Sequence, residues 1–340
     1  MIYRGSNVGG FSQFINYFFP TIYSKAFGLF LFLLVIVSIL KYIFDPKNER
    51  FYEGFGDIYF DLGKRDYADK AYKMSLKHNP NRTYALQRLG DLNTSFSDYD
   101  LSIEYYKKSL KINNKLFFSW KGLGNIYSIQ SKTQDAIDAY ETALKIRSMH
   151  EINLRLALLY KTEGESYINQ KLYDEAINSL EKSISNDPSL GASWELLGDT
   201  YAQKGKHDKA IYAFEQAIEL KSSTVLKYKL FSSLLIVGPQ YYKDGDFERS
   251  KRVFQRATEL NPQSVEAWSY LGNISFKQGN FLDAEKEYRT AISLDPSLAS
   301  AYVGLANVLA QQGNFLAAEK EYRTAISLDP SLASAYVGLA

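Results

Sequence analysis

The chain has 340 residues, with 40 Lys and Arg against 38 Asp and Glu, a formal net charge of +2 and no cysteine. Because the chain has no cysteine, it cannot form disulfides or thiolate metal sites. Its nearly balanced charge gives no sign of the basic face that nucleic-acid binders show. Aromatic residues are abundant, with 27 Tyr and 21 Phe. We interpret most of them as rings that fill contacts between helices, because such rings bury a large apolar area.

The first predicted element is an apolar segment near the N-terminus. Residues 26–44 begin AFGLFLFLLVIVSIL and contain one charged residue, Lys41. As a helix they would span roughly 28 Å, close to the ~30 Å core of a bilayer. Because no signal-peptidase site follows, the sequence predicts an uncleaved transmembrane helix rather than a signal peptide. Residues 1–25 form an N-terminal tail, whose aromatic stretch 11–23 either lies at the membrane interface or is disordered.

Positive residues are slightly more numerous after this segment than before it. Arg4 and Lys25 precede it, whereas Lys41, Lys47 and Arg50 come at its end or follow it. Because Lys and Arg prefer the cytoplasmic side of a membrane, we expect a single-pass protein that contacts the lipid bilayer through residues 26–44. The chain after residue 44 is then expected on the cytoplasmic side.

From residue 49 onward the chain is built from a repeated unit. Residues 280–306 recur at 314–340 with one difference, Asp283 against Ala317. Large apolar residues recur within each unit at spacings of three and four, which is typical of one apolar stripe on a helix. Aligned by these residues and by Gly and Pro, the units span 49–82, 83–116, 117–150, 157–190, 191–224, 231–264, 265–298 and 299–332, and a partial unit follows at 333–340. This period, about 34 residues, predicts an all-α solenoid of about eight helix–turn–helix repeats over 49–340.

Two of the units are preceded by six extra residues, at 151–156 and 225–230. Both inserts continue the helical spacing, so we expect lengthened first helices rather than loops. The unit at 231–264 also carries Pro239 in mid-helix. Because proline there removes a backbone hydrogen bond and costs about 3 kcal/mol in a regular helix, we expect a kink near Leu235–Pro239.

The units resemble the tetratricopeptide repeat family. The segments WKGLGNIY at 120–127 and WELLGDTY at 194–201 match its W-x2-L-G-x2-Y signature. The resemblance covers nearly everything after residue 48 and implies a superhelical array. It does not identify a partner, because members of the family bind many unrelated proteins.

The resemblance also implies a concave groove, which positions 2, 5, 9, 12 and 13 of each unit face in this family. Eight acidic and five basic residues at positions 2, 5, 9 and 13 suggest a mildly acidic groove with a patch of each sign, although an ordinary solvated face would show similar charges. The candidate partner-binding residues are Glu53, Asp57, Asp91, Lys121, Asn125, Lys161, Glu195, Asp199, Tyr242, Lys243, Asn273, Phe276, Lys277 and Asn307.

The clamp by which some family members hold the C-terminal carboxylate of chaperone tails is incomplete here. Lys121 and Asn125 match its first pair of residues. Thr162, Ala192 and Leu196 then stand where Asn, Lys and Arg would be needed. We therefore do not predict binding of chaperone tails.

The sequence offers no catalytic signal. His78, His150 and His207 lie at predicted turns, without a catalytic or metal-binding partner at motif spacing. The glycines follow the frame of the repeat rather than a phosphate-binding loop. We expect a protein that is not an enzyme and that uses no cofactor and no metal.

These observations predict a membrane-tethered scaffold or adaptor that binds a peptide or protein partner in its groove for complex assembly. One alternative is the substrate-recognition arm of a larger enzyme, by analogy with glycosyltransferases that carry such arrays, whose catalytic domain would follow Ala340. Another is a structural subunit of a membrane complex. Because the sequence stops inside a ninth unit, we interpret it as truncated.

Overall fold

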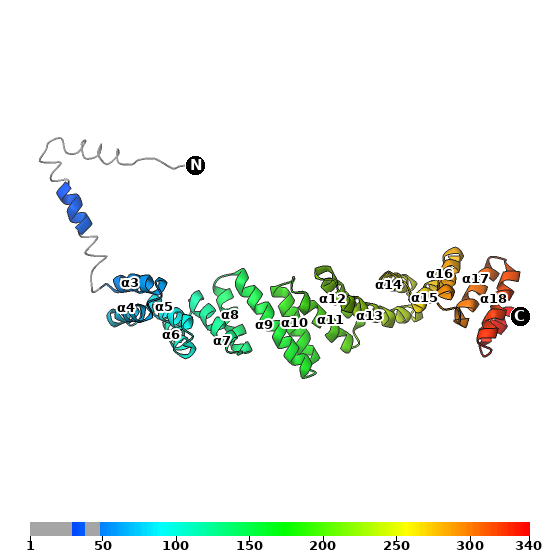
Figure 1. Ribbon diagram of the computed structural model, residues 1–340, viewed down its shortest axis with the longest axis horizontal. Helices are drawn as coiled ribbons and strands as arrows, with labels where there is room; N and C mark the ends of the chain where they lie inside the picture. Colours follow the sequence, from blue (N-terminus) through cyan, green and yellow to red (C-terminus); the bar gives the residue numbers. More distant parts are fainter. Residues whose placement is uncertain (1–28, 38–47) are drawn as a thin grey trace. The chain divides into compact units, whose positions relative to one another are not determined.

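The computed structural model describes residues 29–37 and 48–340, and these are helical with no strand (Figure 1). The chain divides after Ile152 into two compact units. Residues 29–37 form a short apolar helix. Among the described residues, no helix combines the length and the apolar character needed to span a membrane. The rest of the expected 26–44 helix, and the tail at 1–25, lie outside the described residues.

The first unit is a run of antiparallel helix pairs joined by short turns. Each first helix packs on its own second helix, and α3 also contacts α5 while α5 contacts α7. Its helices are α3 (Glu49–Asp61), α4 (Arg65–His78), α5 (Thr83–Ser95), α6 (Tyr99–Ile112), α7 (Phe117–Ile129), α8 (Thr133–Ile146) and the start of α9 (His150–Asn169).

The second unit continues the same pairing. Its first helices again contact the next ones along the chain, α11 with α13, α13 with α15 and α15 with α17. After the rest of α9 it contains α10 (Tyr173–Asn186), α11 (Gly191–Gln203), α12 (His207–Leu220), α13 (Thr224–Lys243), α14 (Phe247–Leu260), α15 (Val265–Lys277), α16 (Phe281–Leu294), α17 (Ala299–Gln311), α18 (Phe315–Leu328) and α19 (Ala333–Leu339).

The turn inside each pair depends on one residue in the left-handed region. Five turns use a glycine there, for example Gly63 at φ 68°. In the other three this residue is Ser97, Ser131 or Lys171, with φ between 57° and 62°. At the turn of Lys171, Leu172 N–H donates to the Tyr167 carbonyl at 2.9 Å and closes the end of α9. The three side-chain-bearing residues adopt a conformation that favours glycine.

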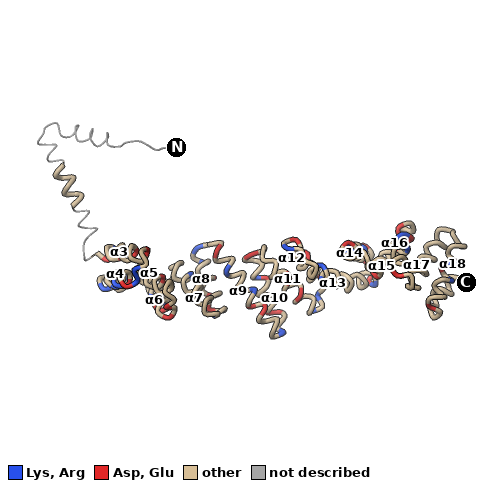
Figure 2. Tube along the Cα trace, in the orientation of Figure 1, with Lys and Arg blue, Asp and Glu red and all other residues tan. Residues whose placement is uncertain are grey.

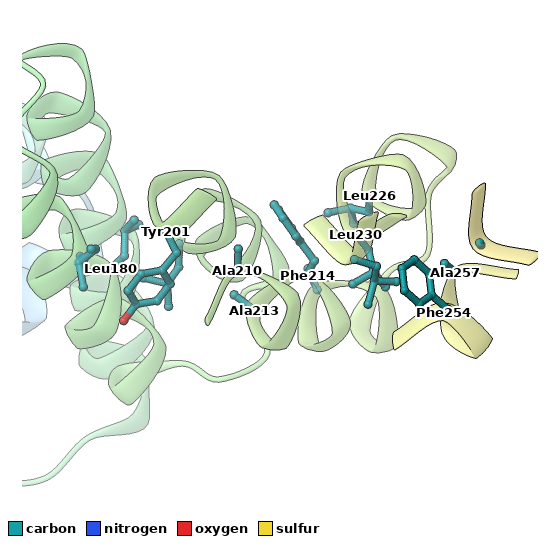
Figure 3. Packing of buried hydrophobic residues seen from close by; sticks show 14 of the residues in the cluster. Leu180, Tyr201, Ala210, Ala213, Phe214, Leu226, Leu230, Phe254 and Ala257 are labelled. Atoms are coloured by element: carbon teal, nitrogen blue, oxygen red, sulfur yellow. The ribbon is translucent and has the colours of Figure 1, made fainter. Parts of the chain in front are cut away.

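In six pairs of the described chain the core contains a ring of the second helix set against a glycine of the first, whereas α10 has Leu180 in place of the ring and α17 has Ala306 in place of the glycine. A Cβ on Gly90 would lie 2.5 Å from Tyr106, and one on Gly122 of the next pair would lie 2.4 Å from the same ring. Tyr106 is therefore enclosed by two successive first helices, and this joins neighbouring pairs into one core. In the second unit Phe214 and Phe254 occupy the equivalent places, with other buried apolar side chains around them (Figure 3).

The two inserts are helical, as their spacing predicts. They lie in α9 and α13, which have 20 residues each. The other first helices from α3 to α17 have 13 residues each. The kink expected at Leu235–Pro239 does not interrupt α13, which runs unbroken through Pro239. Pro239 removes only the bond to the Leu235 carbonyl, and Gly238 next to it packs against Phe254, whose ring would be 2.5 Å from a Cβ there.

Candidate functional site

Tyrosines hold the polar side chain at position 9 in most of the repeats. In five pairs a phenol of the second helix donates to the carboxylate or amide oxygen that the first helix presents at this position. The bonds are Tyr72 to Asp57 (2.7 Å), Tyr106 to Asp91 (2.6 Å), Tyr140 to Asn125 (2.6 Å), Tyr288 to Asn273 (2.7 Å) and Tyr322 to Asn307. These predicted groove residues thus also hold the two helices of their own repeat together.

Asp57 and Asp91 are brought together by an arginine that the sequence analysis did not select. Arg88 Nε donates to Asp57 at 2.8 Å and its Nη1 lies 3.4 Å from Asp91. Tyr84 also donates to Asp57, at 2.7 Å, and the Arg88 guanidinium lies 4.6 Å from the centre of the Phe60 ring. The only sequence signal for Arg88 is its place three residues before Asp91 on one helix.

The titration of this cluster follows from its contacts. Burial alone would raise the pKa of Asp57, but the hydrogen bonds from Tyr84, Tyr72 and Arg88 lower it overall. Burial and the bond to Asp57 raise the pKa of Tyr84 to about 12. Asp57 is therefore a charged acceptor whose donors are already supplied by the chain.

Glu53 lies inside the fold rather than on an open groove. The residue is only 5% exposed. Arg82 forms a two-point ion pair with it, at 2.7 and 2.9 Å, and Ser75 donates at 3.3 Å. A carboxylate can be buried there because Arg82, at the end of the same repeat, reaches back to it.

The inserted residues supply partners for other predicted groove charges. Glu151 pairs with Lys121 at 2.8 Å, and Lys229 donates to Glu195 and Asp199, both at 2.7 Å. Burial lowers the pKa of Lys229, but its bonds to the two carboxylates raise it overall. For Asp199 burial dominates and raises the pKa despite Lys229.

Lysines donate to the carboxylate at position 9 in two repeats whose second helix has no tyrosine to do so. Where a tyrosine would donate to Asp199, the second helix has Phe214, which has no hydroxyl. Lys229 takes the role of that donor. Similarly, Leu180 stands at the place where a tyrosine would donate to Glu165, and Glu165 pairs instead with Lys161 at 2.7 Å.

Two predicted charges differ from these, because they are exposed. Lys243 and Lys277 end α13 and α15, and within the described part of the chain neither has a hydrogen-bond or ion-pair partner. Next to them in sequence are Tyr242 and Phe276, both half-buried. Tyr242 meets Tyr270 edge to face, with ring centres 5.7 Å apart. We call this set the Lys–aromatic surface, which consists of Tyr242, Lys243, Tyr270, Phe276 and Lys277.

Exposed carboxylates also adjoin this surface, because Asp244 follows Lys243 in the chain and Glu248 accepts from Gln278, the residue after Lys277, at 2.7 Å. Burial raises the pKa of Tyr270, and the carboxylate of Glu266, which is exposed on α15, raises it further. Phe247 lies 5.5 Å from Tyr242 and Phe281 lies 5.8 Å from Phe276, ring centre to ring centre. Elsewhere Lys and Arg are interspersed with Asp and Glu along each unit (Figure 2). In the described ranges, no group of three His, Asp or Glu side chains could hold a metal ion.

Two curated proteins that are similar to part of this chain are much longer than the matched segment. The chain is 25% identical over 128 residues to human Protein O-mannosyl-transferase TMTC1, which is 37% of this chain and 13% of that protein. It is 27% identical over 120 residues to Anaphase-promoting complex subunit cut9 of Schizosaccharomyces pombe, 35% of this chain and 17% of that one. The chain thus spans less than a fifth of the length of these curated relatives.

Two of the solved structures to which this chain is similar are a MamA protein and part of a TPR repeat-containing protein. The crystal structure of MamA protein is 23% identical, with 52% of this chain and 94% of that chain covered and a TM-score of 0.37. The C-terminal part of a TPR repeat-containing protein from Cytophaga hutchinsonii is 16% identical, with 74% and 99% covered and a TM-score of 0.38.

Family models match the repeats directly. Three models, each described as tetratricopeptide repeat, match residues 83–116, 148–223, and 238–299 with 271–333. Together these segments take in more than half of the chain, and the helix pairs that they cover form one all-helical array in each unit. The chain is therefore a tetratricopeptide repeat protein.

Proposed function

We propose that this protein is a scaffold that binds a protein or peptide partner on its first helices, centred on the Lys–aromatic surface. The observation that carries the proposal is the contrast between two kinds of predicted groove charge. Within the part of the chain that the structure describes, Lys243 and Lys277 are exposed and unpaired, whereas Asp57, Asp91, Glu195 and the others described above already have partners.

Pairing decides which charges can serve a partner. A ligand that contacted Asp57 would compete with three hydrogen-bond donors of the chain for about four acceptor sites, and displacing one of them would leave a polar or charged group without its partner. The free ammonium groups of Lys243 and Lys277 require no such exchange. Partly buried aromatic rings beside them are of the kind that dominates binding energy in interfaces.

The chemistry of the partner follows from these side chains. Both ammonium groups lack a partner among the described residues, whereas the nearby carboxylates of Asp244 and Glu248 already accept from Gln240 and Gln278. The unpaired positive charges therefore favour a segment that carries carboxylates. Tyr242, Tyr270 and Phe276 favour apolar or aromatic side chains within the same segment. We therefore expect an acidic peptide segment with at least one large apolar residue.

The experiment reverses the two charges. The Lys243→Glu/Lys277→Glu double variant should lose partners that the wild-type chain retains from native membranes. The matched control is Lys286→Glu/Lys320→Glu, which makes the same change of net charge at exposed lysines of two second helices. If both variants retain the same partners as the wild type, the Lys–aromatic surface is not the binding centre.

We also propose that residues 26–44 tether the protein to a membrane, with the repeats on the cytoplasmic side. In the short helix at 29–37, all large apolar side chains except Ile36 are 43–58% exposed. A helix that is apolar all round belongs in a core or a bilayer rather than in water. Flotation of the full chain with liposomes, compared with a chain lacking residues 1–44, tests the tether; equal recovery of both in the soluble fraction contradicts it.

A second candidate function is that of the recognition arm of a larger enzyme. The similarity to the O-mannosyl-transferase TMTC1, of which this chain covers 13%, favours this candidate. In that case the Lys–aromatic surface would hold the protein substrate, and catalysis would belong to another domain. Sequencing the source transcript past codon 340 distinguishes the two, because only the arm requires an additional non-repeat domain.

A further inference from the structure

A period longer than the single repeat runs through the middle of the array. The three tryptophans of the chain, Trp120, Trp194 and Trp268, follow one another at equal spacing. Each indole N–H donates to the carbonyl six residues earlier, at 2.8, 3.0 and 2.9 Å respectively. The hydrogen bond anchors the edge of the indole to the preceding turn in the same way in all three repeats.

Two of these tryptophans form the floor of equivalent pockets, each with a volume of about 440 Å³. One pocket lies in the first unit and the other in the second. Their apolar linings match residue for residue at the spacing of the tryptophans. They are Leu110, Trp120, Leu123, Tyr127 and Ala139 in the first, and Ile184, Trp194, Leu197, Tyr201 and Ala213 in the second.

The repeat of Trp268 has a different floor. Ser275 and Glu287 occupy the places of the tyrosine and the alanine. Burial raises the pKa of Glu287. The three sites are thus two matched apolar pockets and one polar variant.

The rims of the two matched pockets differ. The rim of the Trp120 pocket consists of Lys107, Lys111, Asp135 and Asp138, which carry two charges of each sign. The rim of the Trp194 pocket consists of Glu181, Asp208, Lys209 and Tyr212, so its two acidic residues outnumber its one basic residue. Tyr212 adds a third aromatic ring at the place of Asp138.

The aromatic wall of the Trp194 pocket is open to solvent. Tyr212 is 58% exposed and meets Trp194 edge to face, with ring centres 5.8 Å apart. The Lys209 ammonium already lies 5.4 Å from the centre of the Tyr201 ring, so one cation of the chain itself uses this wall. Trp194 and Tyr212 have no such cation among the described residues.

The carboxylates of this rim retain acceptor capacity. Glu181 accepts one hydrogen bond, from Tyr201 at 2.8 Å, and Asp208 accepts one from Tyr241. An ionised carboxylate offers about four acceptor sites. Both groups can therefore accept further hydrogen bonds from a charged ligand.

We propose that the Trp194 pocket binds an arginine side chain of a partner protein. A guanidinium is attracted to the faces of Trp and Tyr and stacks on them. Its N–H groups reach carboxylates such as Glu181 and Asp208, while its apolar stem covers Leu197 and Ile184. The Trp120 pocket, with two lysines and no third ring in its lining, does not select a cation.

This site is separate from the Lys–aromatic surface and needs a ligand of opposite charge. It is lined by α10, α11 and α12, so it includes second helices. The Lys–aromatic surface lies on α13 and α15. Either proposal can therefore fail without affecting the other.

The test uses the full chain in detergent micelles, labelled with ¹⁵N at tryptophan, and two probes. These are N-acetyl-arginine amide and N-acetyl-citrulline amide, which has nearly the same shape but no charge. The three indole N–H signals are assigned with single Trp→Phe variants. The arginine probe should shift the Trp194 signal and leave the Trp120 signal unaffected. It should bind at least roughly fivefold more tightly than the citrulline probe, because a cation–π attraction of about 1 kcal/mol corresponds to that ratio of dissociation constants.

Two variants change the rim of the Trp194 pocket. Tyr212→Leu removes its third aromatic ring, Glu181→Lys places there the lysine of the Trp120 pocket, and each should weaken arginine binding roughly fivefold. Tyr212 is exposed, so its replacement should leave the helical signal in circular dichroism unchanged. Equal binding of citrulline, an equal response of Trp120, or no shift of Trp194 up to about 100 mM arginine probe would overturn the proposal.

Discussion

Two glycines of α3 give a paired test of how the repeats pack. Gly54 is exposed, and a Cβ there would have no neighbour within 4 Å. A Cβ on Gly56 would lie 2.3 Å from Cε1 of Tyr72, a fully buried ring. Carbon atoms in contact prefer about 3.5–4.0 Å, so the ring or one of the helices would have to move by more than about 1 Å.

The two alanine substitutions should have opposite effects on the free energy of unfolding. Alanine stabilises an exposed helix interior by about 1 kcal/mol relative to glycine, so Gly54→Ala should be the more stable protein. In Gly56→Ala the same gain is opposed by overpacking of about 1–3 kcal/mol. Tyr72 cannot retreat freely, because its hydroxyl is bonded to Asp57. We expect a net loss of about 1 kcal/mol.

The assay is urea unfolding of the full chain in detergent, followed by circular dichroism. Because arrays of repeats can unfold in parts, hydrogen exchange of α3 and α4 should be measured alongside. Gly54→Ala should slow exchange in these helices and Gly56→Ala should accelerate it. If Gly56→Ala proved as stable as Gly54→Ala, the ring would not depend on a glycine for its place.

Three further predictions concern single side chains. Lys171→Gly should raise the thermal midpoint, because a left-handed conformation at φ 62° costs a residue with a side chain about 1 kcal/mol. Tyr106→Phe should lower the free energy of unfolding by about 1 kcal/mol, measured in urea, since the bond to Asp91 is lost; an unchanged midpoint would contradict this. Asp57→Asn should destabilise the protein at pH 7. Because the folded pKa of Asp57 is lowered below its ordinary value of 3.8, the stability from its charge is present above about pH 4 and lost as the pH falls through the folded pKa. The difference between Asp57→Asn and wild type should therefore shrink at pH 3, and a difference that stays constant with pH would refute this reasoning.

The sequence by itself determined the repeat and its helices. The period of the repeat, the spacing of large residues and the small residues at fixed positions are local properties, and each repeat carries them in full. The inserts at 151–156 and 225–230 kept the helical spacing and lengthened α9 and α13. The sequence also predicted a transmembrane helix at 26–44, and this stays a prediction, because most of it lies outside the described residues.

Only the tertiary structure decided which polar side chains remain free. The family frame places Glu53 and Lys243 in the same groove, yet Glu53 is buried against Arg82 and Lys243 is exposed. Such pairs join residues about one repeat apart, and whether they meet depends on how closely neighbouring helices approach. The residue type in the sequence does not show whether a charged side chain is solvated or paired with a neighbouring residue. Their difference is desolvation and pairing, which exist only once the repeats are stacked.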